Sequence, residues 1–182
     1  MSDAPRVPPG SWRETGPAVA AFAWAAGRVT GTEPPAVFRT LGRHRRLFWG
    51  WLHFAGRLMP GGRLARREAE LVILRVAARL GSQYELVQHR RLGRRAGLDA
   101  TEVAAVEDTA AELPASLTDR EQLLLRAADE LLADQDLSDV LWAELGRLLD
   151  EKERIELVLL VGHYAMLATV LQTLRVQPDR PR

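Results

Sequence analysis

The sequence predicts an all-α protein with seven or eight helices. Three observations lead to this fold class. Apolar residues recur at helical spacing, helix start signals with the spacing of a capping box precede several of these segments, and no segment alternates between apolar and polar residues as a strand would. With 182 residues, the chain is long enough for one domain with a real hydrophobic core.

The beginning of the chain is expected to be irregular. Residues 1–16 are predicted to be a loose arm, because prolines and a glycine block regular structure there, namely Pro5, Pro8, Pro9 and Gly10. A short helix could then span 17–28. Pro35 suits the first turn of a helix over 35–42, and another helix is expected over 44–58.

The helix expected over 65–80 is apolar on much of its surface, which predicts a central position in the fold. Gly81 can end this helix in a left-handed conformation. The next helix is expected over 82–96, with Gly97 as its stop. An amphipathic helix should follow over 100–112.

The last three helices have clear start signals. Thr118 with Glu121 and Asp150 with Glu153 have the spacing of a capping box, and Ser138 is a further N-cap candidate. The helices expected from these signals span 119–133, 139–149 and 151–175.

The longest apolar run, 155–174, approaches the length of a membrane span. Polar residues and a glycine interrupt it, namely Glu156, Gly162, His163 and Gln172. We therefore expect a buried helix and no membrane association. The predicted domain covers 17–176, and 177–182 form a short tail.

Composition excludes several function classes. There is no cysteine, so the chain offers no disulfide, thiolate nucleophile or thiolate metal ligand. The formal net charge is only +1, which gives no global field favouring nucleic acid or a membrane. The N-terminal residues lack the basic and apolar regions of a signal peptide, so we expect a cytoplasmic protein.

The candidate site is the stretch from Glu70 to His89. Glu85 and His89 are four residues apart, which places a carboxylate and an imidazole on one helix face. A carboxylate can orient the ring, and histidine is the side chain best suited to proton transfer near neutral pH. Tyr84 adds a phenol, and Glu70 could approach from the preceding helix.

A structural role explains the same residues equally well. Ser82 and Glu85 have the spacing of a capping box, so Glu85 could serve only to start the helix. His89 could lie on a solvated face, because four arginines follow it: Arg90, Arg91, Arg94 and Arg95.

This stretch resembles the signature of the carboxymuconolactone decarboxylase family, which includes the alkylhydroperoxidase D-like proteins. The peroxidases of that family carry a glutamate, eleven residues, a cysteine, two residues, a second cysteine, three residues and a histidine. Glu70 and His89 match the glutamate and the histidine, while Ser82 and Glu85 occupy the cysteine positions. The resemblance is strongest over 64–98.

The resemblance implies an alkylhydroperoxidase D-like helical bundle that forms a trimer or hexamer, with a dimer as the alternative. Thiol peroxidase chemistry is excluded, because serine and glutamate cannot form a sulfenic acid or a disulfide. The family's lactone decarboxylases also lack the cysteine pair. They imply cofactor-free acid–base chemistry, a decarboxylation, isomerisation or elimination, on a small organic acid or lactone.

The resemblance also assigns roles to the residues. His89 would be the general acid–base, Glu85 its partner, and Glu70 and Tyr84 supporting polar groups. Three further residues are candidates for the substrate pocket: Ser82, His163 and Tyr164.

Three other interpretations remain open. Glu70, Glu85, His89 and His163 are ligand types that suit zinc or non-haem iron, although no motif fixes their geometry and the resemblance implies no metal. Residues 92–103 resemble a helix-turn-helix, but acidic groups on its second helix would be repelled by DNA phosphates. The strongest rival is a non-catalytic oligomeric helical protein that has kept the fold.

Overall fold

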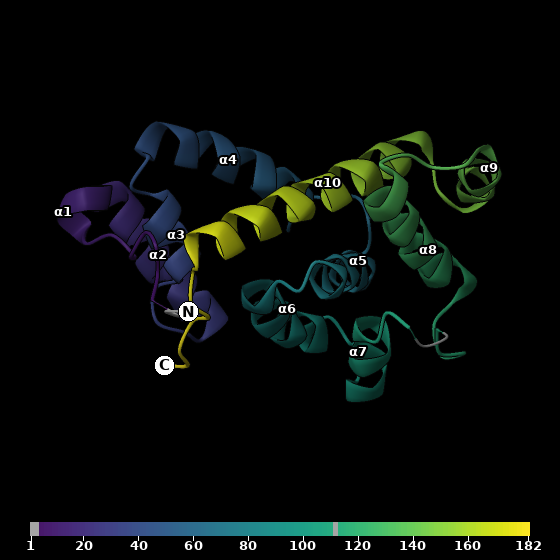
Figure 1. The fold of residues 1–182 in the computed structure, drawn as a ribbon, viewed down its shortest axis with the longest axis horizontal. Helices are drawn as coiled ribbons and strands as arrows, with labels where there is room; N and C mark the ends of the chain where they lie inside the picture. The colour runs from purple at the N-terminus through teal and green to yellow at the C-terminus, as the bar shows by residue number, and fades with distance from the viewer. Residues whose placement is uncertain (1–3, 111–112) are drawn as a thin grey trace. The chain divides into compact units, whose positions relative to one another are not determined.

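The computed structural model describes residues 4–110 and 113–182, and these residues form helices joined by turns (Figure 1). No strand is present among them, and one isolated bridge joins Thr32 and Pro181. The helices are α1 (Trp12–Thr15), α2 (Pro17–Thr30), α3 (Ala36–Leu41), α4 (Arg45–Leu58), α5 (Arg66–Arg79), α6 (Gln83–Arg95), α7 (Ala100–Glu107), α8 (Asp119–Asp134), α9 (Asp139–Leu148) and α10 (Glu151–Leu174).

The predicted all-α fold class is confirmed. The described residues contain ten helices, of which eight have at least eight residues, while α1 and α3 are shorter. The prediction of a helix over 100–112 is wrong about where the helix ends. α7 stops at Glu107 because Asp108 is extended, with ψ at 93°, and residues 111–112 lie outside the described part of the chain.

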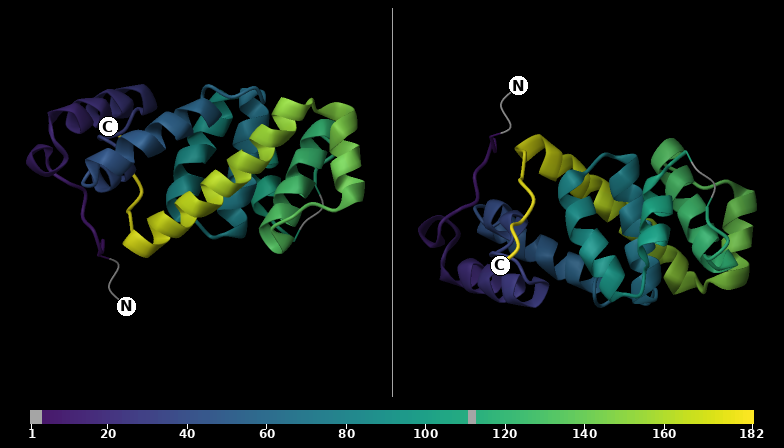
Figure 2. Two further views of the ribbon diagram at one scale, coloured as in Figure 1. Left: turned by 90° about the horizontal axis from the view of Figure 1, so that it is seen from above. Right: turned by 90° about the horizontal axis from the view of Figure 1, so that it is seen from below.

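The chain's contacts group into two units, one containing 1–55 with 169–182 and the other containing 56–168. In the second unit, α5 packs against α6, α7 and α8, so its predicted central position is confirmed. Nine consecutive residues of α5, Ala69 to Ala77, are buried, including the charged Glu70 and Arg75. The helices α8 and α9 run side by side in both views of Figure 2.

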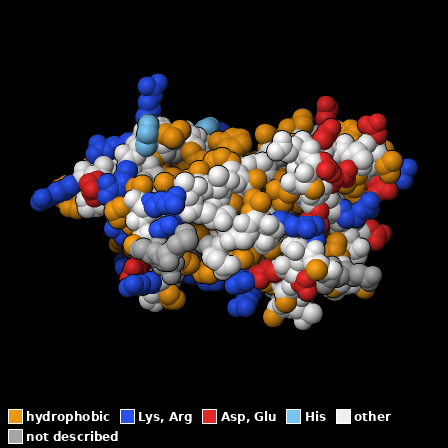
Figure 3. Space-filling view, in the orientation of Figure 1, with side chains coloured by type: hydrophobic (Ala, Val, Ile, Leu, Met, Phe, Trp, Pro, Cys, Tyr) orange, Lys and Arg blue, Asp and Glu red, His pale blue; other side chains and the backbone are white. Residues whose placement is uncertain are grey.

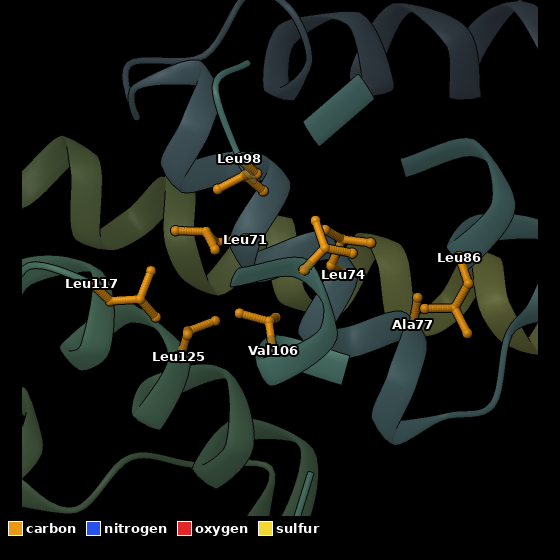
Figure 4. Close-up of a cluster of buried hydrophobic side chains, with 9 residues drawn as sticks. Leu71, Leu74, Ala77, Leu86, Leu98, Val106, Leu117 and Leu125 are labelled. Carbon is orange, nitrogen blue, oxygen red and sulfur yellow. The ribbon is translucent and has the colours of Figure 1, made fainter. Parts of the chain in front are cut away.

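An aliphatic cluster fills the space around α5 (Figure 4). Leucines and small apolar residues from α5, α6, α7 and the start of α8 contribute to it, and their exposed fractions do not exceed 6%. Each fully buried leucine stabilises the fold by about 2 kcal/mol relative to an exposed one. The members are Leu71, Leu74, Ala77, Leu86, Leu98, Val103, Val106, Leu117 and Leu125.

The turn between α5 and α6 positions the candidate site. Gly81 has φ +67°, the left-handed conformation that its sequence position predicted. The Ser82 N–H donates to the carbonyl of Ala77 over 2.8 Å and closes the end of α5. α6 therefore begins directly after α5 and packs back against it.

The first unit has an aromatic core. Phe48 is 1% exposed, and its ring lies 5.1 to 6.2 Å from the rings of Phe22, Phe38, Trp49 and Trp51. The predicted arm contains α1, whose first turn is closed by a capping box of Ser11 and Glu14. The predicted tail is tied to the same unit by hydrogen bonds from Ala36 N–H to Asp179 and from Arg182 N–H to the Gly31 carbonyl.

α10 is 24 residues long and, among the described residues, is the one helix apolar enough to cross a membrane by length and composition. Of the most apolar 18-residue stretch of α10, 44% is buried inside the protein. Hydrophobic side chains also reach the surface there (Figure 3), at Ile155, Val158, Leu159 and Met166.

The predicted capping box of α8 is confirmed, and its loss should be measurable. The Thr118 hydroxyl accepts from the Glu121 N–H, and Glu121 accepts from the Thr118 N–H over 2.9 Å. We expect Thr118→Ala to lower the free energy of unfolding by about 1 kcal/mol. Urea denaturation would measure this change, with Thr101→Ala, an exposed threonine in α7, as the control. Equal stabilities of the two variants would contradict a stabilising cap.

Candidate active site

The glutamate of α5 and the histidine of α6 meet inside the second unit. His89 Nδ1 lies 2.6 Å from Glu70 Oε2, and the side chains are 10% and 0% exposed. Because an ionised carboxylate can only accept, Nδ1 carries the proton of this hydrogen bond. The other ring nitrogen, Nε2, is then the one that can take up or release a proton.

Arg66 holds the second oxygen of Glu70. Its Nη2 lies 2.7 Å from Glu70 Oε1, one helical turn earlier on α5. The buried carboxylate is therefore paired with a cation on one side and with the imidazole on the other. Sequence reasoning missed Arg66, although its i, i+4 spacing from Glu70 was the signal that could have identified it.

Glu85 lies in the interior without a hydrogen-bond partner. It is 2% exposed, and no described residue is in hydrogen-bonding geometry with either carboxylate oxygen. Burial raises the pKa of Glu85 to about 7, against smaller lowering effects of the neighbouring Ser82 hydroxyl and of His89. Glu85 is therefore poised to exchange a proton near neutral pH.

The helix-cap alternative for Glu85 is wrong. Ser82 precedes α6, but its hydroxyl makes no cap hydrogen bond, and Glu85 does not reach back to the backbone. Ser82 is completely buried. Ser82 and Glu85 thus lie one helical turn apart in the interior, where neither forms a cap and the Ser82 hydroxyl is close enough to Glu85 to lower its pKa.

A phenol does lie beside the histidine, and it comes from α10. The ring of Tyr164 is 5.2 Å from that of His89 and perpendicular to it, at 89°. Burial raises the pKa of Tyr164, and the charges of Glu70 and Glu85 raise it further. Tyr164 therefore lies against His89 and remains protonated at neutral pH.

The other two predicted residues are buried but placed differently. Tyr84 lies one position before Glu85 and therefore points about 100° away from it around α6. His163 is 5% exposed, and burial lowers its pKa to about 4, so it is neutral. The solvated position considered for His89 is also wrong, since His89 is 8% exposed.

The metal interpretation gains no support from the geometry. Within residues 4–110 and 113–182, no group of three or more histidines and acidic residues is arranged so that it could hold a metal ion.

A groove of about 440 Å³ lies between α8 and α9. Its lining contains none of the site residues and consists of Asp119, Gln122, Leu123, Arg126, Glu144, Arg147 and Leu148.

Comparison with known proteins agrees with this arrangement. The sequence model of the carboxymuconolactone decarboxylase family matches residues 45–130, which include Glu70, Ser82, Glu85 and His89. Residues 45–130 are therefore similar to this family. No curated protein matches the sequence.

Solved structures of peroxidase-related proteins share the fold. An uncharacterized peroxidase-related protein from Silicibacter sp. TM1040 superimposes with a TM-score of 0.83 at 16% identity, over 98% of this chain and 95% of that one. An uncharacterized peroxidase-related protein with an alkylhydroperoxidase AhpD core, from Ralstonia eutropha JMP134, gives 0.79 at 17% identity, over 94% and 92%. The alkylhydroperoxidase D-like fold is therefore confirmed.

A third solved structure with a similar fold is that of a debrominase. A cysteine-to-alanine variant of the debrominase Bmp8, in complex with 2,3,4-tribromopyrrole, superimposes with a TM-score of 0.76 at 16% identity. The superposition covers 94% of this chain and 90% of that one. At this identity the likeness establishes the fold and leaves the reaction to be argued from the residues.

The buried Glu85 predicts a pH dependence of stability. Its pKa is about 7 in the folded protein against an ordinary 4.5, so its stabilising contribution is complete below pH 4.5 and is lost as the pH rises through 7. His163 acts in the opposite sense, because its contribution is complete above pH 6.5 and is lost as the pH falls through 4.

We therefore expect the stability difference between wild type and Glu85→Gln to fall by about 3 kcal/mol between pH 4.5 and pH 8. Urea denaturation of both proteins across this range would measure the difference. The contribution of His163 cancels, since both proteins retain it. Stability curves that stay parallel over the whole range would show that Glu85 titrates normally.

Proposed function

We propose that this protein is a carboxymuconolactone decarboxylase-like enzyme that uses cofactor-free acid–base chemistry. The observation that carries the proposal is the buried Glu70–His89 pair beside an unpartnered Glu85 whose pKa is about 7. A base and an acid held one turn apart on α6 are what a proton-transfer reaction needs. The substrates in question are small organic acids or lactones.

Each residue of the site has a role in the proposed reaction. Glu70, fixed by Arg66, orients the His89 ring. Nε2 of His89 takes a proton from the substrate. Glu85 supplies a proton to the developing oxyanion and recovers it in the return step, while the Tyr164 ring limits the orientation of the imidazole.

The geometry favours this proposal over the non-catalytic alternative. A protein that kept only the fold was expected to have Glu85 engaged in a helix cap, His89 exposed, and no enclosed pocket between Glu70 and His89. The first two expectations are not met. Thiol peroxidase activity is not proposed, because Ser82 and Glu85 stand where that reaction needs sulfur, and neither residue can be oxidised and reduced reversibly.

The proposal is tested by a panel of small lactones and unsaturated acids incubated with wild type and with His89→Ala in D₂O. NMR would detect deuterium entering carbon positions, loss of CO₂, or movement of a double bond. We expect turnover of at least one compound by the wild type and its loss in the variant. Equal turnover by the two proteins would contradict the assigned role of His89.

We further propose a cytoplasmic homo-oligomer, a trimer or hexamer before a dimer. Four exposed apolar side chains on α10, Ile155, Val158, Leu159 and Met166, support a contact between copies. Binding of nucleic acid is not proposed, because Glu102 and Glu107 of the would-be recognition helix would be repelled by DNA phosphates. Light scattering coupled to size-exclusion chromatography would give the mass of the assembly.

A further inference from the structure

We infer that the site takes an uncharged carbonyl compound and discriminates against carboxylates. The inference rests on the proposed function and narrows its substrate class. It follows from two observations. These are the partners that the arginines around the site already have, and the sign of the charges that face His89.

Each arginine of α5 already has an acidic partner. Arg66 pairs with Glu70 inside the site, and Arg67 pairs with Glu102 and Glu121. Arg75 and Arg79 both bind Asp129 over 2.7 Å. No guanidinium of α5 is therefore left to bind a substrate carboxylate, the interaction for which arginine is best suited.

Other cations of the neighbouring helices have partners, are distant or point away. Arg94 and Arg95 lie in the last turn of α6, about 140° and 120° around the helix from His89. On α6, Arg90 binds Glu107 over 2.6 Å, and Arg91 binds Gln88, which belongs to the same helix. On α10, the guanidinium of Arg154 lies 4.7 Å from the centre of the Trp142 ring. Lys152 is eleven positions before His163 on that helix, or about 16 Å along the axis.

The groups that do face the histidine favour a neutral ligand. Besides His89 these are Glu70, Glu85 and Tyr164, and the charge of Glu70 is already balanced by Arg66. The two carboxylates raise the pKa of the Tyr164 phenol, and at pH 7.5 the ionised fraction of Glu85 would disfavour a substrate carboxylate at the same place. Glu85, Ser82 and Nε2 of His89 instead offer hydrogen bonds to an uncharged carbonyl group and its neighbouring carbon.

The reaction that fits such a ligand is movement of a double bond. His89 Nε2 removes a proton from the carbon next to the carbonyl group, and the electron pair of that C–H bond forms the C=C bond of an enol. Glu85 gives its proton to the carbonyl oxygen in the same step. The enol then returns the oxygen proton to Glu85 and accepts the proton of His89 at the γ carbon, so that no proton or electron is gained or lost overall.

The test compares the binding of two probes, α-angelica lactone and pent-3-enoate, which present a β,γ-unsaturated carbonyl group in uncharged and ionised form. Titrations followed by NMR at pH 7.5 would give both dissociation constants. They would be repeated with Arg147→Ala, which removes a cation from the α8–α9 groove, and unchanged constants would show that this cation does not contribute to binding. We expect the lactone to bind at least about tenfold more tightly than the carboxylate.

Any other order of affinities, including no detectable binding of either probe, would overturn the inference. Failure of the proposed function gives a different result. If the lactone binds preferentially but exchanges no proton with D₂O, the ligand class stands and the catalytic role falls. If the carboxylate binds more tightly and reacts, the catalytic role stands and the ligand class falls.

Discussion

Replacing His89 with alanine is expected to lower the turnover of any substrate found in the panel by about 10²- to 10⁴-fold. The change removes Nε2, the only atom in the site placed by a buried carboxylate for proton transfer. It leaves Glu70 paired with Arg66, so the buried charge stays compensated and the fold should survive. Initial rates of the two purified proteins measure the effect, and circular dichroism checks that the variant is folded.

Two controls make this result specific. His53→Ala removes an exposed histidine from α4 and should retain wild-type turnover. Added imidazole should restore part of the activity of His89→Ala, because it can enter the space left by the ring and supply the missing base. A variant that keeps the wild-type rate would remove His89 from the mechanism.

Replacing Arg75 with methionine is expected to lower the free energy of unfolding by about 3 kcal/mol. Arg75 is 4% exposed, binds both oxygens of Asp129 and donates to the carbonyls of Val106 and Asp108. The variant leaves these acceptors buried without their donor, although Arg79 still holds one oxygen of Asp129. This arginine therefore joins α5 to α8 and to the end of α7.

The matched control for this prediction is Arg126→Met. Arg126 pairs with Glu144 on the surface, where the two side chains are 56% and 35% exposed, and such pairs contribute less than about 1 kcal/mol. Urea denaturation of both variants at neutral pH measures the difference. Equal losses of stability would show that burial of the Arg75 pair contributes nothing.

Much of the fold could be predicted from local signals. Thr118 and Asp150 start helices with the capping boxes that their spacing predicts, and Gly81 has the left-handed conformation expected at the end of α5. These features depend on a few neighbouring residues. The sequence therefore contains what is needed to identify them.

The predictions failed where two segments have the same sequence pattern and the surrounding tertiary structure decides which conformation each one adopts. Ser82 and Glu85 have the same spacing as Thr118 and Glu121, yet only the second pair forms a cap. The start of α6 is buried, and the Glu85 side chain lies in the interior instead of returning to the backbone. Spacing alone cannot distinguish these two outcomes, because it gives no information on which side of a helix end is buried against the rest of the protein.

The partners of the site residues were likewise only partly predictable. The sequence allowed Glu70 to approach from the preceding helix, but its pairing with His89 requires two helices to pack in one register, which no local pattern reports. Tyr164 is 75 residues beyond His89 in the sequence, so no local pattern could show that it, and not Tyr84, lies against the imidazole. The end of α7 and the short helix α1 were missed because helices of one or two turns have weak signals.

The central claim is that Glu70 holds His89 with Nδ1 protonated and Nε2 available as the base. The ¹⁵N chemical shifts of the His89 ring, measured above the pH at which the ring loses its charge, test this directly. The account predicts the tautomer with the proton on Nδ1 in the wild type, and loss of that preference in Glu70→Gln, whose amide can also donate. A wild-type ring protonated on Nε2, or a tautomer unchanged in Glu70→Gln, would contradict the account.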